Sequence, residues 1–308
     1  MADLPSSLKQ WKQLLVVEMG LVSNDEWDRA AGKYSRSGDP EADPRLFVES
    51  LSRIQRPLKN SQVPLLSEFQ LDEILAGRCS SLILDSPRGR LTLSAKIGAG
   101  GSGEVFSAVL AARRGRDSLV AVKFIAFRSD EEKRRIDREC KVLCAPRPDD
   151  AAGNHLVQGM FSFNATARQC VLVMEWVPGG TLNEFIQNQL QATRRLSVKD
   201  VLLLAHGIAS GLAYLHRQGL VHRDLKPANV LLRIANRTET PVPVIADLGL
   251  VKDINHLLTV HGARCGTLYY SAPECFQDSA SATAVSDLYS LAAVIVFMLT
   301  GRPPKGEL

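Results

Sequence analysis

The sequence lacks the features typical of zinc-binding, disulfide-bonded, secreted or membrane-spanning proteins. None of its six cysteines stands in a CxxC pair, so zinc sites and a disulfide framework are not expected. Nothing near the first residue resembles a secretory signal peptide. The longest apolar run near the C-terminal end, Leu291–Leu299, is far shorter than the roughly 20 residues that span a bilayer. We therefore expect a soluble, cytoplasmic protein without a membrane span.

A strong charge of one sign is also missing. The net charge is +4 over 308 residues, and the Lys and Arg residues are scattered rather than gathered into one basic block. Nucleic acid is therefore not an expected partner. Hydrophobic residues make up 45% and charged residues 23%, which is close to the averages of globular proteins and predicts a buried core.

The first 85 residues have apolar side chains at helical spacing. Residues 23–25 (Ser-Asn-Asp) offer an N-cap for one of these helices. Pro57 and Pro64 bracket a loop, after which residues 66–75 predict another short helix. Residues 1–85 are therefore predicted to form a small helical module.

The pattern changes at Leu91. From there, short apolar runs alternate with glycine turns, as is typical of strands, and long helical periods return from about residue 182. The sequence thus predicts an α+β fold in which a strand-rich lobe precedes a helix-rich lobe.

A glycine-rich stretch follows this change, with the pattern GxGxxGxV directly after Ile97. Gly98, Gly100 and Gly103 would let backbone amides approach a phosphate closely. A dinucleotide-binding fold would need these glycines to open a helix, whereas residues 105–109 look like a strand. A phosphate-binding loop between two strands is therefore favoured.

Lys123 ends a strand-like VAVK run and would lie beneath the glycine loop, where its ammonium neutralises phosphate charge. The alternative is a surface lysine whose stem lies along the protein. Glu139, sixteen residues later, falls in a predicted helix over residues 133–143 and could pair with Lys123. Val142 and Leu143 indicate that this part of the helix is half buried, which favours the pair over a solvated glutamate.

The longest motif is HRDLKPAN at residues 222–229, and it resembles the catalytic loop of eukaryotic-type protein kinases. A carboxylate at Asp224 can orient and deprotonate an attacking hydroxyl, and the amide oxygen of Asn229 can hold a magnesium ion. The resemblance implies that Lys226 steadies the γ-phosphate. The later IADLG segment resembles the metal-binding segment of the family, so Asp247 would bridge Mg²⁺ to the β- and γ-phosphates.

The resemblance covers residues 91 to about 304 and is to serine/threonine protein kinases of the eukaryotic-like, bacterial type. It implies a bilobal fold over residues 91–308, with a β-rich N-lobe and an α-rich C-lobe. ATP and Mg²⁺ are the implied cofactors, and a protein with Ser or Thr hydroxyls is the implied substrate. Lys226 and the pair Gly266-Thr267 resemble the serine/threonine branch rather than the tyrosine branch.

The same resemblance assigns an ATP pocket. Residues 174–180 look like the hinge between the lobes, where the backbone of Glu175 and Val177 would bond adenine and Met174 would gate the pocket behind it. The remaining residues assigned to this pocket are Ile97, Val105, Ala121 and Leu231.

Some features depart from the family or add to it. Leu248 replaces the usual Phe after Asp247, which we expect to alter the stability of the active arrangement. Arg223 resembles the arginine of kinases in which a phosphorylated residue orders the activation segment, because its positive charge needs an anionic partner. Thr259 is the candidate phosphorylation site. The chain stops at Leu308, so the C-lobe is expected to lack its last helices and to leave Glu274 without an evident partner.

Two functions from different classes are consistent with these residues. In the first, the chain is an active phosphotransferase. In the second, it is a truncated, pseudokinase-like protein that binds ATP or docks a partner through residues 1–85. The presence of Lys123, Asp224, Asn229 and Asp247 together favours the first, because a chain that had abandoned catalysis has no chemical reason to keep all four.

Overall fold

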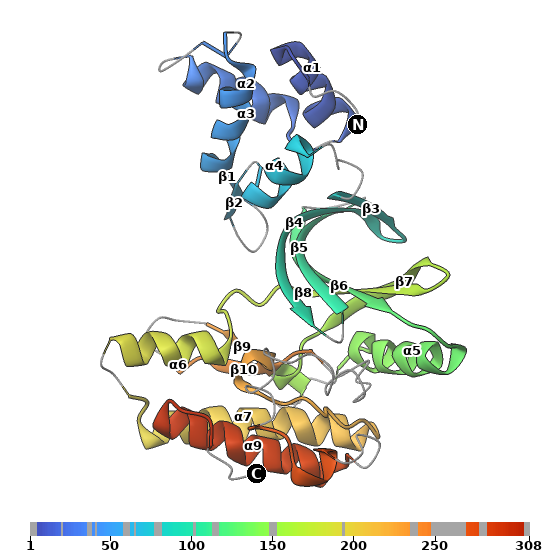
Figure 1. The fold of residues 1–308 in the computed structure, drawn as a ribbon, viewed down its shortest axis with the longest axis vertical. Coiled ribbons are helices and arrows are strands. Elements are labelled where there is room, and N and C mark those ends of the chain that lie inside the picture. The colour runs from blue at the N-terminus through green and yellow to red at the C-terminus, as the bar shows by residue number, and fades with distance from the viewer. Residues whose placement is uncertain are drawn as a thin grey trace. The chain divides into compact units, whose positions relative to one another are not determined.

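The structure is a computed structural model (Figure 1). It describes residues 5–19, 21–35, 39–40, 42–57, 62–64, 66–76, 82–100, 103–112, 117–147, 153–192, 195–234, 240–247, 269–276 and 282–304. The chain divides into two compact units. The first comprises residues 1–99 and 104–124, and the second comprises residues 100–103 and 125–308.

Unit 1 begins with the helical module that the sequence predicted. Its elements are α1 (Leu8–Lys12), a π-helix (Gln13–Glu18), α2 (Asn24–Tyr34), α3 (Pro44–Ser50), a 3₁₀ turn (Leu51–Arg53), β1 (Gln55–Pro57), β2 (Gln62–Pro64) and α4 (Glu68–Leu75). Ser23 caps α2: its side chain accepts from the backbone N–H of Glu26, and the Glu26 carboxylate accepts from the backbone N–H of Ser23. Trp27 and Tyr34 pack edge-on against the buried ring of Phe47, which gives the module a core of its own.

Only part of the segment that the sequence predicted as a loop between the two prolines is described. Residues 62–64 belong to β2, which pairs with β1 as a two-stranded antiparallel ribbon in which Gln55 lies opposite Pro64, and residues 58–61 lie outside the described residues. Proline cannot donate to a ladder, so it is found on edge strands, and both strands of this ribbon end with one.

The rest of unit 1 is a run of neighbouring strands. They are β3 (Ile83–Ser86), β4 (Gly89–Gly100), β5 (Gly103–Ala112) and β6 (Ser118–Ala126), adjacent in this order. β5 and β6 are antiparallel, with Val105 opposite Lys123. Because side chains alternate across a sheet, Val105, Ala121 and Lys123 share one face, and Phe106 and Phe124 lie on the other.

Unit 2 begins with α5 (Asp130–Cys144) and the antiparallel strands β7 (Gly159–Thr166) and β8 (Gln169–Glu175). Its later elements are α6 (Leu182–Gln191), α7 (Val198–Arg217), β9 (Val230–Arg233), β10 (Val242–Ile245) and α9 (Ala284–Thr300), with short 3₁₀ turns at Gly153–His155, Pro227–Asn229 and Pro273–Phe276. β9 and β10 form an antiparallel pair (Figure 1). The sequence-predicted order of strands before long helices is confirmed.

Helix α7 is the core of the helical part of unit 2. Its apolar stripe, which includes the buried residues Leu204, Ile208 and Leu215, packs toward α9 and β10. Among the described residues, α7 alone is long and apolar enough to cross a membrane by length and composition, and 44% of its most apolar window is buried. Core helices meet the same criteria, so this finding is weak evidence for a membrane span.

Candidate active site

The segment between α7 and β9 is held by one buried carboxylate. Asp287, in the first turn of α9, accepts from the backbone N–H of His222 at 2.8 Å and from that of Arg223 at 2.9 Å. The Nε2 atom of His216 lies 2.8 Å from the same carboxylate. These contacts fix the backbone just before Asp224.

Three predicted site residues meet in this segment. Asp224 is 8% exposed and Asn229 is 6% exposed. Lys226 Nζ lies 3.1 Å from Asp224 Oδ2, and Asn229 Nδ2 donates to the same oxygen at 3.1 Å and to the Asp224 carbonyl at 2.8 Å. Two donors therefore converge on one carboxylate oxygen, which holds the Asp224 side chain in a single orientation.

Asp247 is the second residue after β10, and its neighbour Ala246 is hydrogen-bonded to the same segment. The N–H of Ala246 donates to the Asn229 carbonyl at 2.9 Å, and the Ala246 carbonyl lies 3.1 Å from Nε2 of the buried His222. Asp247 itself has a positive φ of 57°. A left-handed backbone is uncommon for a residue other than glycine, and it is not compatible with strand conformation, so the extended backbone has ended at this acidic residue.

Arg223 is the second residue with a positive φ, at 65°. Its Nε atom is buried and has no hydrogen-bond partner among the residues that the structure describes. The partner that the sequence predicted is a phosphorylated Thr259, which lies outside the described residues, as does Leu248. Both expectations stay predictions.

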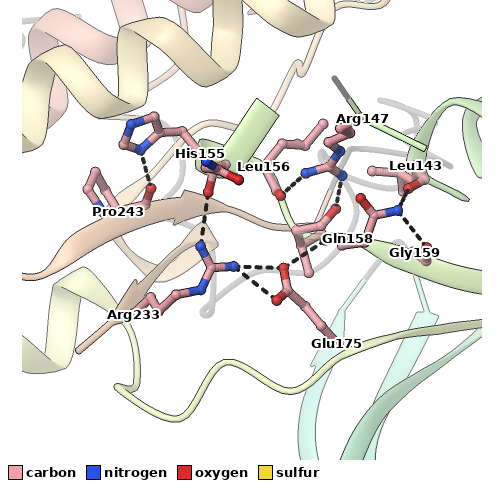
Figure 2. Close-up of polar contacts among 11 residues, drawn as sticks. Leu143, Arg147, His155, Leu156, Gln158, Gly159, Glu175, Arg233 and Pro243 are labelled. Atoms are coloured by element: carbon pink, nitrogen blue, oxygen red, sulfur yellow. Dashed lines mark hydrogen bonds and ion pairs between the residues drawn. The ribbon is translucent and has the colours of Figure 1, made fainter. Parts of the chain in front are cut away.

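The predicted hinge carries a polar network, shown in Figure 2. Glu175 donates its backbone N–H to the Gln158 carbonyl at 2.9 Å, and its Oε1 accepts from the Gln158 N–H at 2.9 Å. Arg233 Nη2 lies 2.9 Å from both Oε1 and Oε2 of Glu175. Met174 and Val177 on either side are buried. The Glu175 side chain thus joins the hinge to β9.

Gln158 extends this network to the end of α5. Its Nε2 donates to the carbonyls of Leu143 at 3.0 Å, Ala145 at 3.3 Å and Gly159 at 2.8 Å. The carbonyls in the last turn of a helix have no partner within the helix, so a side-chain amide satisfies them here. Arg147 reinforces the same region by donating to the carbonyls of Leu156 and Val157 (Figure 2).

Leu231, the predicted residue below the adenine, is held beside the chain that leaves the hinge. It forms an isolated bridge with Thr181, and the next residue, Leu232, donates its N–H to the Gly180 carbonyl at 2.9 Å. The side chain of Leu231 is half buried. The structure therefore brings Leu231 close in space to the segment that follows Val177.

The residues that the sequence predicted to lie near the phosphates occupy the consecutive strands β4, β5 and β6. Lys123 is 2% exposed, which excludes the surface-lysine alternative, and it shares a face with Val105 and Ala121. Gly103 has a φ of 122°, a conformation that a side chain would strain. The other glycine-loop residues, Ile97, Gly98 and Gly100, lie in the last part of β4.

Glu139 lies in α5, within the helix that the sequence predicted over residues 133–143. Its side chain is 14% exposed, and its Oε1 lies 4.0 Å from Arg135 Nε one turn earlier. Lys123 belongs to unit 1 and Glu139 to unit 2, so their pairing stays a prediction.

One sequence-based expectation is wrong. Glu274 was expected to have no evident partner, but its Oε1 accepts from Ser286 Oγ at 2.7 Å. This hydrogen bond lowers the pKa of the Glu274 carboxyl below its ordinary value. The expectation failed because the partner hydroxyl lies twelve residues away and meets the carboxylate only through tertiary packing.

Comparisons with known proteins agree with this geometry. Residues 91–307 match the protein kinase domain family. The chain is 33% identical over 218 residues to a probable serine/threonine-protein kinase, PkwA, of Thermomonospora curvata, covering 70% of this chain and 27% of the relative. It is 32% identical over 210 residues to the serine/threonine-protein kinase AfsK of Streptomyces coelicolor, covering 68% of this chain and 24% of the relative.

The chain thus spans about a quarter of the length of these two curated relatives. Among solved structures, a mutant of the PknI kinase domain of Mycobacterium tuberculosis is similar, with a TM-score of 0.52 and 25% identity over 71% of this chain and 77% of that one. The family match covers well over half of the chain, and the strand-rich and helix-rich parts follow in the family's order. This chain therefore belongs to the protein kinase family and has its bilobal fold, preceded by a helical module.

Proposed function

We propose that this chain is a serine/threonine protein kinase that transfers the γ-phosphate of Mg-ATP to Ser or Thr hydroxyls of proteins. The observation that carries the proposal is the geometry of Asp224. Lys226 Nζ and Asn229 Nδ2 both contact one oxygen of its carboxylate, and Asp287 holds the backbone before it through the N–H of Arg223. A fixed, buried carboxylate flanked by a cation is suited to receive a proton beside a phosphoryl group. Relatives named as serine/threonine kinases support the same choice of substrate.

In the proposed reaction, Asp224 orients the substrate hydroxyl and accepts its proton. The hydroxyl oxygen forms a bond to the γ-phosphorus, and the bond between that phosphorus and the β–γ bridging oxygen breaks. The products are a phosphorylated side chain and ADP, which keeps the electron pair of the broken bond. Lys226, 3.1 Å from Asp224, balances charge on the transferred phosphoryl group.

The donor set of the site fits Mg²⁺. Asn229 and Asp247 would supply oxygen ligands, and Ala246, the residue before Asp247, donates its N–H to the Asn229 carbonyl. Among the described residues, no group of three or more His, Cys, Asp or Glu side chains could hold a metal. Mg²⁺ suits this sparse set, because it is commonly bound by one or two protein oxygens, with phosphates and water completing the octahedron. The ion would neutralise charge on the β- and γ-phosphates.

The nucleotide is assigned to the hinge and the glycine loop. The Glu175 N–H is bonded to Gln158, so the Glu175 carbonyl is the group we assign to adenine, together with the backbone of Val177. Lys123, paired with Glu139, would hold the phosphates. Lining residues for the adenine and the glycine loop are Ile97, Gly98, Gly100, Gly103, Val105, Ala121, Met174 and Leu231.

Transfer of labelled γ-phosphate to a generic Ser/Thr protein substrate and to the chain itself tests the proposal. The Asp224→Asn variant keeps the side-chain volume but removes the base, and we expect transfer to fall by roughly 10²-fold or more. Asp85→Asn, at a side chain that is 91% exposed, is the matched control and is expected to keep wild-type activity.

Two results would contradict the proposal. Wild-type protein that binds Mg-ATP but transfers no phosphate would favour the docking or pseudokinase alternative. Transfer that survives equally in Asp224→Asn and Asp85→Asn would place the base elsewhere.

A further inference from the structure

Helix α4 of the helical module is hydrogen-bonded to β4, the strand that leads into the glycine-rich loop. Ser67, the N-cap of α4, donates its hydroxyl to the carbonyl of Ser94. Gln70, which is 5% exposed, donates from Nε2 to the carbonyl of Leu93 at 2.8 Å. β3 pairs with β4 as far as Thr92, so α4 takes the two carbonyls that come next along the strand.

The same two residues also close the capping box of α4. The Ser67 hydroxyl accepts from the N–H of Gln70 at 3.1 Å, and Gln70 Oε1 accepts from the N–H of Ser67 at 2.9 Å. Gln70 therefore uses Oε1 for the capping box and Nε2 for the strand, while the single hydroxyl of Ser67 accepts within the box and donates to the strand. An ordinary capping box needs only the first of these interactions.

An aromatic row continues the contact across the sheet. Phe69 of α4 lies 5.7 Å from Phe106 of β5, and Phe106 lies 5.6 Å from Phe124 of β6 in an edge-on arrangement, both measured between ring centroids. Phe106 and Phe124 lie on the face opposite Lys123, so the row supports the sheet from behind the predicted phosphate side.

The other side of α4 is part of the module core. Ile74 and the preceding Leu66 are fully buried in the cluster that includes Trp11, Trp27 and Phe47. The helix is therefore anchored at one side by this core and at the other by β4 and the aromatic row. All of these residues belong to unit 1.

We propose that α4 is a brace that positions the two strands flanking the glycine-rich loop, with Gln70 and Phe69 as positioning residues for Mg-ATP. This inference rests on the proposed kinase function. The kinase-family match begins at residue 91, so the brace lies outside the residues by which the family is recognised. It gives residues 66–76 a role within the chain.

The variant Gln70→Glu tests the brace with little change to the helix. Glutamate serves the capping box as well as glutamine does, but it replaces the Nε2 donor with an oxygen that faces the Leu93 carbonyl. Gln10→Glu is the matched control, because Gln10 closes the capping box of α1 with Ser7 and is exposed. Both variants are compared in the full chain at pH 8.

Two readouts separate positioning from stability. The KM for ATP, or the Kd for Mg-ATP, is expected to rise about fivefold in Gln70→Glu, the equivalent of one lost hydrogen bond, with kcat changing by less than about twofold. Amide hydrogen exchange of residues 89–98 without nucleotide is expected to quicken in Gln70→Glu and to stay at the wild-type rate in Gln10→Glu. Phe69→Ala should also quicken exchange and raise the KM for ATP. Phe69→Leu, which keeps an apolar contact with Phe106, should stay close to the wild type in both measurements.

Wild-type exchange in residues 89–98 of Gln70→Glu and Phe69→Ala overturns the brace, whatever the phosphotransfer assay gives. Quickened exchange with an unchanged affinity for Mg-ATP overturns the positioning role. If the wild type transfers no phosphate while exchange and Mg-ATP affinity still depend on Gln70, the proposed kinase function fails and the brace stands.

Discussion

One guanidinium nitrogen of Arg233, Nη2, lies 2.9 Å from each carboxylate oxygen of Glu175 (Figure 2). Glu175 ends β8 at the predicted hinge, and Arg233 ends β9, the strand that begins directly after Asn229. The ion pair therefore connects the backbone that we assign to adenine with the strand that follows the proposed catalytic loop. A disturbance at either residue reaches both parts of the proposed site.

A double-mutant cycle with Glu175→Gln and Arg233→Gln measures this connection. The two side chains are 29% and 36% exposed, so we expect a coupling of only about 0.5–1 kcal/mol in the free energy of unfolding, decreasing at high salt. The KM for ATP is expected to rise about twofold to threefold in each single variant. Urea unfolding and initial-rate kinetics give the two quantities.

The control for this cycle is the Lys12–Asp28 pair on the helical module, at 2.6 Å. Its removal should alter stability by a similar or smaller amount and leave the KM for ATP unchanged. If the hinge variants also left that KM unchanged, the ion pair would be a stabilising contact with no influence on nucleotide binding.

Asp287→Asn is expected to destabilise the protein by roughly 2–4 kcal/mol, because a buried carboxylate that accepts two backbone N–H groups is replaced by a group with one acceptor oxygen. Activity should fall as well, since the backbone before Asp224 loses its support. Asp200→Asn is the matched control: Asp200 is also in the first turn of a long helix, but it is half buried and accepts from the hydroxyls of Ser197 and Thr240 rather than from backbone N–H groups. Because a hydroxyl can donate or accept, we expect a cost of only about 1 kcal/mol. Equal losses in the two variants would contradict a special role for Asp287.

Local patterns predicted much of the fold. The VAVK run that ends at Lys123 predicted the strand that is β6, and the Ser-Asn-Asp stretch at residues 23–25 predicted the N-terminus of α2. Both signals depend only on residues that are close together in the sequence. The proposed catalytic segment could be predicted for a different reason. The proposed chemistry requires Asp224 and Asn229 at a fixed short spacing, so the motif is visible in the sequence itself.

Contacts between distant residues could not be predicted in this way. Gln158 and Arg233 have no motif, and their role comes from meeting Glu175 across 17 and 58 residues of chain. The Ser286–Glu274 bond was missed for the same reason. The bonds from α4 to β4 span 23 and 27 residues, and a capping box looks the same in sequence whether or not a strand lies beside it.

Tyr270 predicts a pH dependence of stability. Burial raises the pKa of its phenol from 10.0 to about 12, and its ring packs edge-on against Phe297 of α9. The native state therefore holds the phenol proton more tightly than the unfolded chain does. This contribution to stability is fully present below pH 10 and is lost as the pH rises from 10 toward 12.

The comparison with Tyr270→Phe isolates this effect. The variant has no phenol to ionise, so the difference in unfolding free energy between wild type and variant should shift in favour of the variant above pH 10 and stay constant below it. Urea unfolding at a series of pH values measures the difference. A constant difference across the whole range would show that the phenol ionises equally well in the folded protein.

Asp247→Asn is expected to raise the Mg²⁺ concentration needed for half-maximal phosphate transfer by roughly tenfold or more, because one anionic oxygen ligand becomes a neutral one. The backbone should tolerate the change: Asp247 has a φ of 57°, and Asn adopts this left-handed conformation as readily as Asp does. Titration of Mg²⁺ in the transfer assay, with complete loss of transfer in excess chelator, measures the effect, and Asp85→Asn serves as the control. A wild-type Mg²⁺ dependence in Asp247→Asn, with unchanged stability, would remove Asp247 from the metal site and leave Asn229 as the one proposed ligand.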